Sequence, residues 1–227
     1  MKKLIFIFLV VFTGCSSMQA QSGSVNDELA GRIRAFWNYV SENENRLFAA
    51  NPNNMTIYAE IENQAQLINE NLHAFLNNEI INDKRELIIS CGGNKNYFDL
   101  CDRVAAAAPV YAHLIPVSLL PPIERVEEFE LYAIRGQTLL PTDIRVHFDD
   151  DDGEDLHFLF LLSANHLAIL QSDNTGQLYS VYMQGLYNMT FQALGERKSA
   201  RVKSAEIALL PLIMPSIPLL ELKNHIH

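Results

Sequence analysis

The pattern of apolar and polar positions over residues 85–114 predicts a strand, a tight turn and a helix in succession. Residues 87–89 form a short apolar, mostly β-branched run, as expected of a buried strand. Gly92-Gly93 interrupts the run, and Asn94 follows as a helix N-cap. Apolar side chains then recur at helical spacing until Pro109: Phe98, Cys101, Val104, Ala105 and Ala108. The other predicted elements lie on either side of this unit.

Three further segments have helical periodicity. A long first helix begins near Ser24, and a second begins at Met55. A last helix begins after a cap at Asp173 or Thr175 and ends at Gly195. The apolar stripe of the first helix consists of Leu29, Ile33, Phe36, Trp37, Val40, Leu47 and Phe48.

The remaining apolar segments have the short runs or the alternation of β-strands. Asn82-Asp83-Lys84 is a hairpin turn between the first two strands. Strands clustered between helices favour an α+β fold over a doubly wound parallel sheet. We therefore expect one domain over residues 27–222, with a mixed, mostly antiparallel sheet and helices packed on one face. The predicted strands are residues 72–81, 86–91, 114–120, 128–135, 143–149, 156–162 and 202–210.

The N-terminus has the pattern of a bacterial export signal. Lys2 and Lys3 precede an apolar run over residues 4–12, which is too short to span a bilayer. The following sequence, FTGC, resembles the lipobox of bacterial lipoproteins. This resemblance implies removal of residues 1–14, lipidation of Cys15, and acylation, for example with palmitate. The alternative is an ordinary secretory signal with an incidental cysteine.

The residues after Cys15 indicate in which membrane the lipid anchor is expected. Residues 15–26 are small and polar, as in a flexible tether. Ser16 is not the aspartate that the resemblance associates with inner-membrane retention in enteric bacteria, so the outer membrane is favoured. No later run of 18 apolar residues occurs, and the lipid is the only membrane anchor that we expect.

Charge and cysteine content narrow the function classes. The hydrophobic content of 48% fits a globular chain, and the net charge of -10 argues against nucleic acid as a partner. Beside Cys15, the chain has two cysteines, Cys91 and Cys101. An exported compartment permits a disulfide between them, and two buried free thiols are the alternative.

An ordered set of motifs resembles a family of bacterial proteins of unknown function. FWNYVSENENRLF, ELIISCGGNKNYF, AAAAP, LPTDIRVHF and LGE occur in this order between Leu29 and Glu196. That family has an FWxWF-like helix start, ELxIS-x-GN, an AAP helix end and a C-terminal LGE in the same order. The resemblance implies a shared fold and gives no mechanism.

The acidic stretch from Asp149 to Asp155 suggests a metal site between two histidines. His147 and His157 are symmetric about Asp152, and in a hairpin they could lie opposite each other beside Asp149. The EF-hand template fails, because aligning its glycine with Gly153 puts apolar residues at two ligand positions. A solvated acidic turn is the better interpretation, with His147, Asp149, Asp152 and His157 as weak metal candidates.

Two other candidates for chemistry have simple structural alternatives. The backbone amides of Cys91-Gly92-Gly93-Asn94 could bind an anion, although tight-turn geometry also explains the glycines. Cys91 could pair with His113 or His166, but the chain contains no GxSxG, HExxH or CxxC motif.

These observations favour a non-enzymatic envelope lipoprotein that recognises a protein or a small ligand, with no cofactor expected. The alternative is a hydrolase or metal-dependent enzyme that uses the acidic hairpin with His147 and His157.

Overall fold

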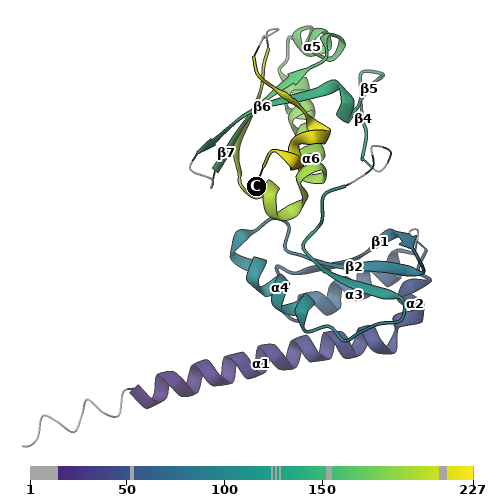
Figure 1. Ribbon diagram of the computed structural model, residues 1–227, viewed down its shortest axis with the longest axis vertical. Helices are drawn as coiled ribbons and strands as arrows, with labels where there is room; N and C mark the ends of the chain where they lie inside the picture. Colours follow the sequence, from purple (N-terminus) through teal and green to yellow (C-terminus); the bar gives the residue numbers. More distant parts are fainter. Residues whose placement is uncertain are drawn as a thin grey trace, which may run out of the picture. The chain divides into compact units, whose positions relative to one another are not determined.

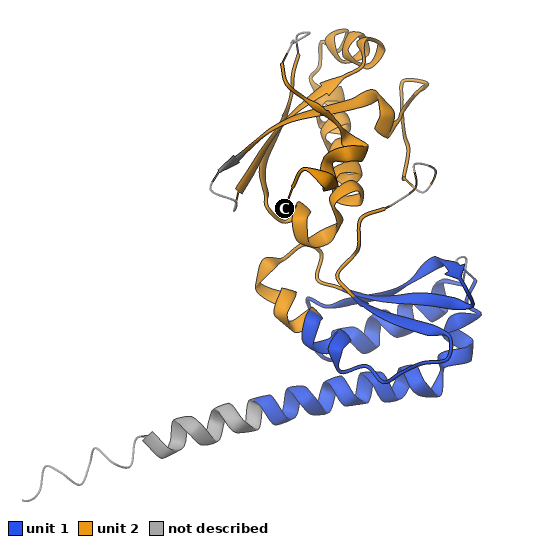
Figure 2. Cartoon of the chain, in the orientation of Figure 1, with its two compact units in different colours: residues 1–89, 102–117 blue, residues 90–101, 118–227 orange. Residues whose placement is uncertain are grey.

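The computed structural model describes residues 15–51, 54–123, 125, 127, 129–151, 155–209 and 214–226, and among these the side chains from residue 26 onward except those of residues 150 and 151. The chain divides into two compact units (Figure 2). The first contains residues 1–89 and 102–117, and the second contains residues 90–101 and 118–227. The sequence pattern predicted one domain over residues 27–222. The contacts of the backbone divide the chain into two compact units, and the chain passes from the first unit to the second twice. The predicted α+β class is confirmed.

The first unit combines helices with a three-stranded sheet of order β1-β2-β3. Figure 1 shows α3 and α1 on the same side of this sheet. The predicted first helix begins at Cys15 and not near Ser24, so residues 15–26, expected to be a flexible tether, are helical. The helix is broken at Asn43, whose side-chain amide donates to the Tyr39 carbonyl at 2.8 Å. The elements are α1 (Cys15–Glu42), α2 (Glu44–Phe48), α3 (Met55–Gln66), β1 (His73–Ile81), β2 (Lys84–Ser90) and β3 (Leu114–Ser118).

Local sequence explains the hairpin between β1 and β2. Asn82 and Asp83 have φ angles of 53° and 56°, the left-handed conformation of a two-residue hairpin turn. Asn and Asp tolerate this conformation better than other residues with side chains. The predicted hairpin turn is therefore confirmed.

The core of the first unit is built on the aromatic stripe of α1. Phe36 and Trp37 are almost fully buried, and their ring centroids are 4.8 Å apart in an edge-on arrangement. The Trp37 indole donates to the Val104 carbonyl at 2.8 Å, so its one polar atom is satisfied. Helix α3 buries Ile57, Ile61 and Ala65, as its periodicity predicted.

The second unit is built around a four-stranded sheet of order β8-β7-β6-β9. Strands β6 and β7 are antiparallel, and β7 and β8 are parallel. Helix α6 and the short helix η4 contribute to the apolar core with one face of this sheet. The elements are η1 (Lys95–Tyr97), α4 (Phe98–Ala106, which crosses the unit boundary), β4 (Tyr132–Ile134), β5 (Gln137–Leu139), η3 (Pro141–Asp143), β6 (Ile144–Asp151), β7 (Asp155–Leu162), α5 (Ala164–Gln171), α6 (Gln177–Ser199), β8 (Val202–Ile207), β9 (Ile217–Pro218) and η4 (Leu219–Asn224).

Several details differ from the sequence prediction. The described strands form three separate sheets, because β4 and β5 pair only with each other. The sequence pattern did not predict α5, whose residues ANHLAILQ place apolar side chains around most of the helix rather than in one stripe. None of the helices in the described part of the chain is long and apolar enough to cross a bilayer.

Candidate functional site

The register of the acidic hairpin separates the two candidate histidines. His157 lies opposite Asp149, and His147 lies opposite Leu159. The predicted alignment of the two histidines is therefore not found, because the pairing centres on residue 153 and not on residue 152. Asp152 itself lies outside the described residues.

Each of these histidines already has a partner within the fold. His147 Nδ1 is 2.7 Å from the Pro215 carbonyl oxygen, and its Nε2 is 3.8 Å from an Asp149 carboxylate oxygen. His157 Nδ1 is 2.6 Å from the Ser204 hydroxyl. No three His, Cys, Asp or Glu side chains among those described are arranged to hold a metal ion. That the hairpin is no catalytic metal centre remains a prediction.

The glycine turn after β2 binds a carboxylate that the chain itself supplies. Gly92 and Gly93 have φ angles of 62° and 80°, a left-handed pair that only glycine adopts readily. The amides of Cys91 and Gly93 both donate to Glu196 Oε1 at 2.9 Å. The amide of Leu120 donates to Glu196 Oε2 at 3.0 Å. An anion therefore does occupy this turn, and it is the side chain of Glu196. We call Glu196 and its three amide donors the carboxylate nest.

The backbone around Gly195 delivers Glu196 to the nest. Gly195 has φ 71° and ψ 172°, which interrupts α6 where the sequence predicted its end. A Cβ at this position would lie 2.8 Å from the Leu120 carbonyl oxygen, so only glycine fits. The Glu196 amide in turn donates to that carbonyl at 2.8 Å. Leu119, buried and at φ 63°, is a strained neighbour held in place by this reciprocal bonding.

Two opposing effects set the pKa of Glu196, which is fully buried. Burial raises the pKa of its carboxyl, while hydrogen bonds from the Gly93, Leu120 and Cys91 amides lower it. A hydrogen bond with the Ser90 hydroxyl lowers it further, and the net result is a pKa below the ordinary value for Glu. The nest therefore favours an ionised, negatively charged Glu196.

A second buried charge, Arg85, lies in the first unit and was not predicted from the sequence. Its side chain is 1% exposed. The guanidinium donates to four backbone carbonyls and one hydroxyl: Asn77 at 2.6 Å, Leu47 and Phe48 at 3.2 Å, Ala50 at 2.6 Å, and the Tyr58 hydroxyl at 2.9 Å. The alternation along β2 could have indicated that Arg85 is buried, because Arg85 falls on the same strand face as Leu87 and Ile89.

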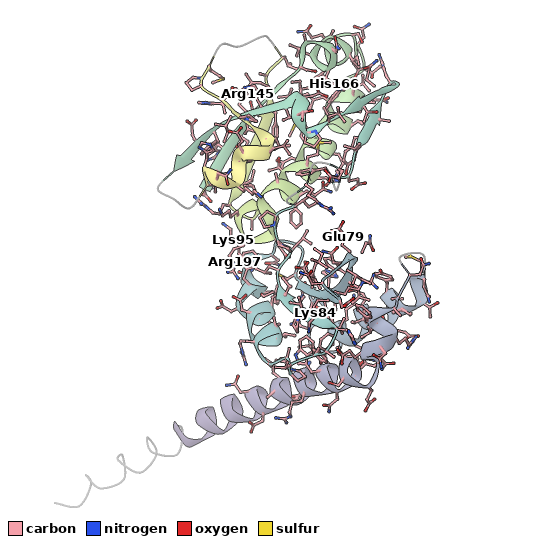
Figure 3. The ribbon with its side chains drawn as sticks, turned by 45° about the vertical axis from the view of Figure 1, so that its right-hand side comes forward. Glu79, Lys84, Lys95, Arg145, His166 and Arg197 are labelled. Atoms are coloured by element: carbon pink, nitrogen blue, oxygen red, sulfur yellow. The ribbon has the colours of Figure 1, made fainter. Side chains whose placement is uncertain are left out.

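A third polar cluster surrounds His166, which points into the second unit (Figure 3). Its Nδ1 is 2.8 Å from the Tyr182 hydroxyl, and its Nε2 is 3.2 Å from the Thr138 carbonyl oxygen and 3.7 Å from an Asp143 carboxylate oxygen. Burial raises the pKa of the Tyr182 hydroxyl. Both ring nitrogens of His166 thus have partners other than Cys91, and the considered Cys–His pairing is not found there.

His113, the other considered partner of Cys91, also has its own contacts. Its ring stacks on Phe48 with centroids 4.7 Å apart, and its Nδ1 is 3.3 Å from the Asp83 carbonyl oxygen.

Three large apolar side chains of the first unit are exposed at the start of α3 and the end of β1. Ile80 and Ile81, beside the turn of the β1–β2 hairpin, are 49% and 61% exposed, and Met55 is 73% exposed. The Tyr58 hydroxyl donates to the Asn78 side chain at 3.3 Å, which joins the first turn of α3 to the end of β1. Met55 thus begins the helix that this bond links to the strand carrying Ile80 and Ile81. We call Met55, Ile80 and Ile81 the hairpin tip.

No family model, curated protein or solved structure matches this chain. Function must therefore be inferred from the arrangement of the residues themselves.

Proposed function

We propose that this chain is a lipid-anchored protein of the bacterial envelope whose folded part is a non-enzymatic recognition module. The hairpin tip carries the proposal, because it exposes three large apolar side chains at the start of α3 and the end of β1. Large apolar side chains left exposed to water in this way are often part of binding sites. The partner is a protein or a small apolar ligand.

The state of the polar clusters supports recognition rather than catalysis. Glu196, Arg85 and His166 are at least 97% buried, and each is bonded to backbone groups of its own unit. A catalytic acid or base must reach the substrate within hydrogen-bonding distance. These three side chains are instead used to hold loops and helix ends, and no observation favours the hydrolase alternative.

The proposed location rests on the FTGC sequence at the end of the apolar run. Residues 1–14 lie outside the described residues. Lipidation of Cys15 and the outer membrane as its destination are proposals supported by that lipobox resemblance. Membership of the uncharacterised bacterial family is likewise a proposal, supported by the order of the four motifs that the family shares with this chain.

Replacing Cys15 by alanine should abolish membrane anchoring. In a bacterial host, Cys15→Ala should leave an unacylated precursor with residues 1–14 attached, since the lipobox cysteine is both the acceptor and the cleavage site. Intact mass and detergent partitioning measure this directly. Ser16→Ala is the matched control and should stay acylated. Equal masses and equal partitioning of wild type and Cys15→Ala would refute the anchor.

The hairpin tip should contact a partner that another exposed apolar residue of the same unit does not contact. A photo-crosslinking amino acid at position 81 should give an adduct of defined mass in intact cells. The control is position 110 in the same unit, where Val110 is fully exposed. Met55→Ser with Ile80→Ser should weaken the position-81 adduct about tenfold, as for the loss of a hot spot. Equal adducts at positions 81 and 110 would argue against recognition at the tip.

A further inference from the structure

The two cysteines of the folded part meet inside the second unit. Cys91 precedes the glycine turn and is 5% exposed, and Cys101 lies in α4 and is fully buried. Both are thiols in this structure. The Cys91 thiol contacts the Asn94 carbonyl oxygen at 3.4 Å and is hydrogen-bonded to Cys101. The glycine turn and the first turn of α4 thus bring the two sulfurs next to each other.

We propose that Cys91 and Cys101 are the site of a buried disulfide, formed by exchange with a disulfide-bearing oxidant before Glu196 binds the amides of the carboxylate nest. The bond would tie the glycine turn to α4 and so support the amides that hold Glu196. Bond formation requires the sulfurs to approach to about 2.05 Å. The proposal goes beyond the recognition function and relies on it only for export into an oxidising compartment.

The exchange balances without any further reactant. The thiolate of one cysteine attacks a sulfur of the oxidant's disulfide and expels one oxidant thiolate, leaving a mixed disulfide. The other cysteine then attacks the protein sulfur of that mixed disulfide and expels the second oxidant thiolate. The two thiol protons end on the oxidant, which is reduced by two electrons to a dithiol.

The native surroundings of Cys91 explain why the exchange precedes folding. Both thiols are buried in the folded chain, so a large oxidant does not reach them. Burial raises the pKa of the Cys91 thiol to about 11, the contact with Cys101 lowers it, and the charge of Glu196 raises it. Thiolate, the attacking species, is therefore scarce in the folded chain at neutral pH. Glu196 follows Cys91 by 105 residues, so the emerging chain presents both cysteines before this carboxylate arrives.

The test uses the full mature chain with Cys15→Ser, which leaves Cys91 and Cys101 as its only cysteines. The reduced, unfolded chain is refolded in a glutathione buffer with equal reduced and oxidised forms. Maleimide labelling after denaturation and intact mass then count the thiols. We expect more than nine-tenths of chains without a free thiol, and a thermal midpoint about 5 °C above that of the reduced chain. Two free thiols per refolded chain would overturn the proposal.

A second experiment tests whether the disulfide forms before Glu196 binds the turn. Native reduced protein placed in the same buffer should oxidise at least tenfold more slowly than the same protein with Glu196→Gln. Glu206→Gln, at an exposed position, is the matched control and should oxidise at the wild-type rate. Equal rates in wild type and Glu196→Gln would overturn the protective role of Glu196. Protein extracted from cells with two free thiols, despite complete oxidation during refolding, would refute export and not the disulfide site.

Discussion

Replacing Glu196 by glutamine should lower the free energy of unfolding by about 3 kcal/mol. The substitution keeps the size of the side chain, but its amide group turns donors toward the amides of Cys91, Gly93 or Leu120. At least one buried N–H then loses its acceptor, and the charge that strengthens the other bonds is gone. Urea unfolding followed by far-UV circular dichroism measures the loss. A change below 0.5 kcal/mol would contradict a structural role for the nest.

The same pair of proteins should show a defined dependence on pH. The pKa of Glu196 is lowered in the folded chain, so its stabilising contribution is fully present above the unfolded pKa of about 4.3. That contribution disappears as pH falls through the folded pKa. The stability difference between wild type and Glu196→Gln should thus be constant near pH 7 and shrink below about pH 4. Glu206→Gln, which removes an exposed charge, should stay within about 0.5 kcal/mol of wild type.

Replacing Arg85 by methionine should destabilise the first unit by about 2–4 kcal/mol. The substitution preserves the apolar stem but removes five hydrogen bonds to buried or half-buried acceptors. Two of these acceptors, the Leu47 and Phe48 carbonyls, end α2, where a cation is also favoured by the helix dipole. Trp37 is the only tryptophan and lies in the first unit, so its fluorescence reports the unfolding of this unit.

Two further variants distinguish hydrogen bonding from charge at this position. Arg85→Lys keeps the charge but loses the planar fork of donors, and we expect about half of the Arg85→Met loss. Arg46→Met removes a half-exposed arginine of the same unit and should change stability by less than 1 kcal/mol. Equal stabilities of Arg85→Met and Arg46→Met would mean that the buried guanidinium does not hold α2 and β1 together.

Local sequence patterns predicted the elements that depend only on residues close together in the chain. The succession of β2, glycine turn and α4 follows from residues that are neighbours in the chain. The Asn94 side chain indeed accepts a bond from the Asn96 amide at the helix start. The Asn82-Asp83 turn likewise needs only two residues that tolerate positive φ. Periodicity also placed the buried face of α3 correctly.

Long-range pairings could not be read in the same way. Glu196 lies 105 residues from Cys91 in sequence, and no local pattern indicates that its carboxylate fills the glycine turn. The hairpin register differs from the symmetric alignment of His147 and His157, because turn geometry rather than residue type sets register. The division into two units also depends on long-range contacts, since the chain enters the second unit at two separate places.

The pKa of Glu196 in the folded protein tests most directly whether the glycine turn binds the chain's own anion. Carbon-13 NMR of the side-chain carboxyl, assigned by comparison with Glu196→Gln, gives this value from a pH titration. We predict a pKa below the ordinary value for Glu, because the three amides and the Ser90 hydroxyl stabilise the charged form more than burial opposes it. A pKa raised above the ordinary value would show a buried carboxyl without these donors and would contradict the nest.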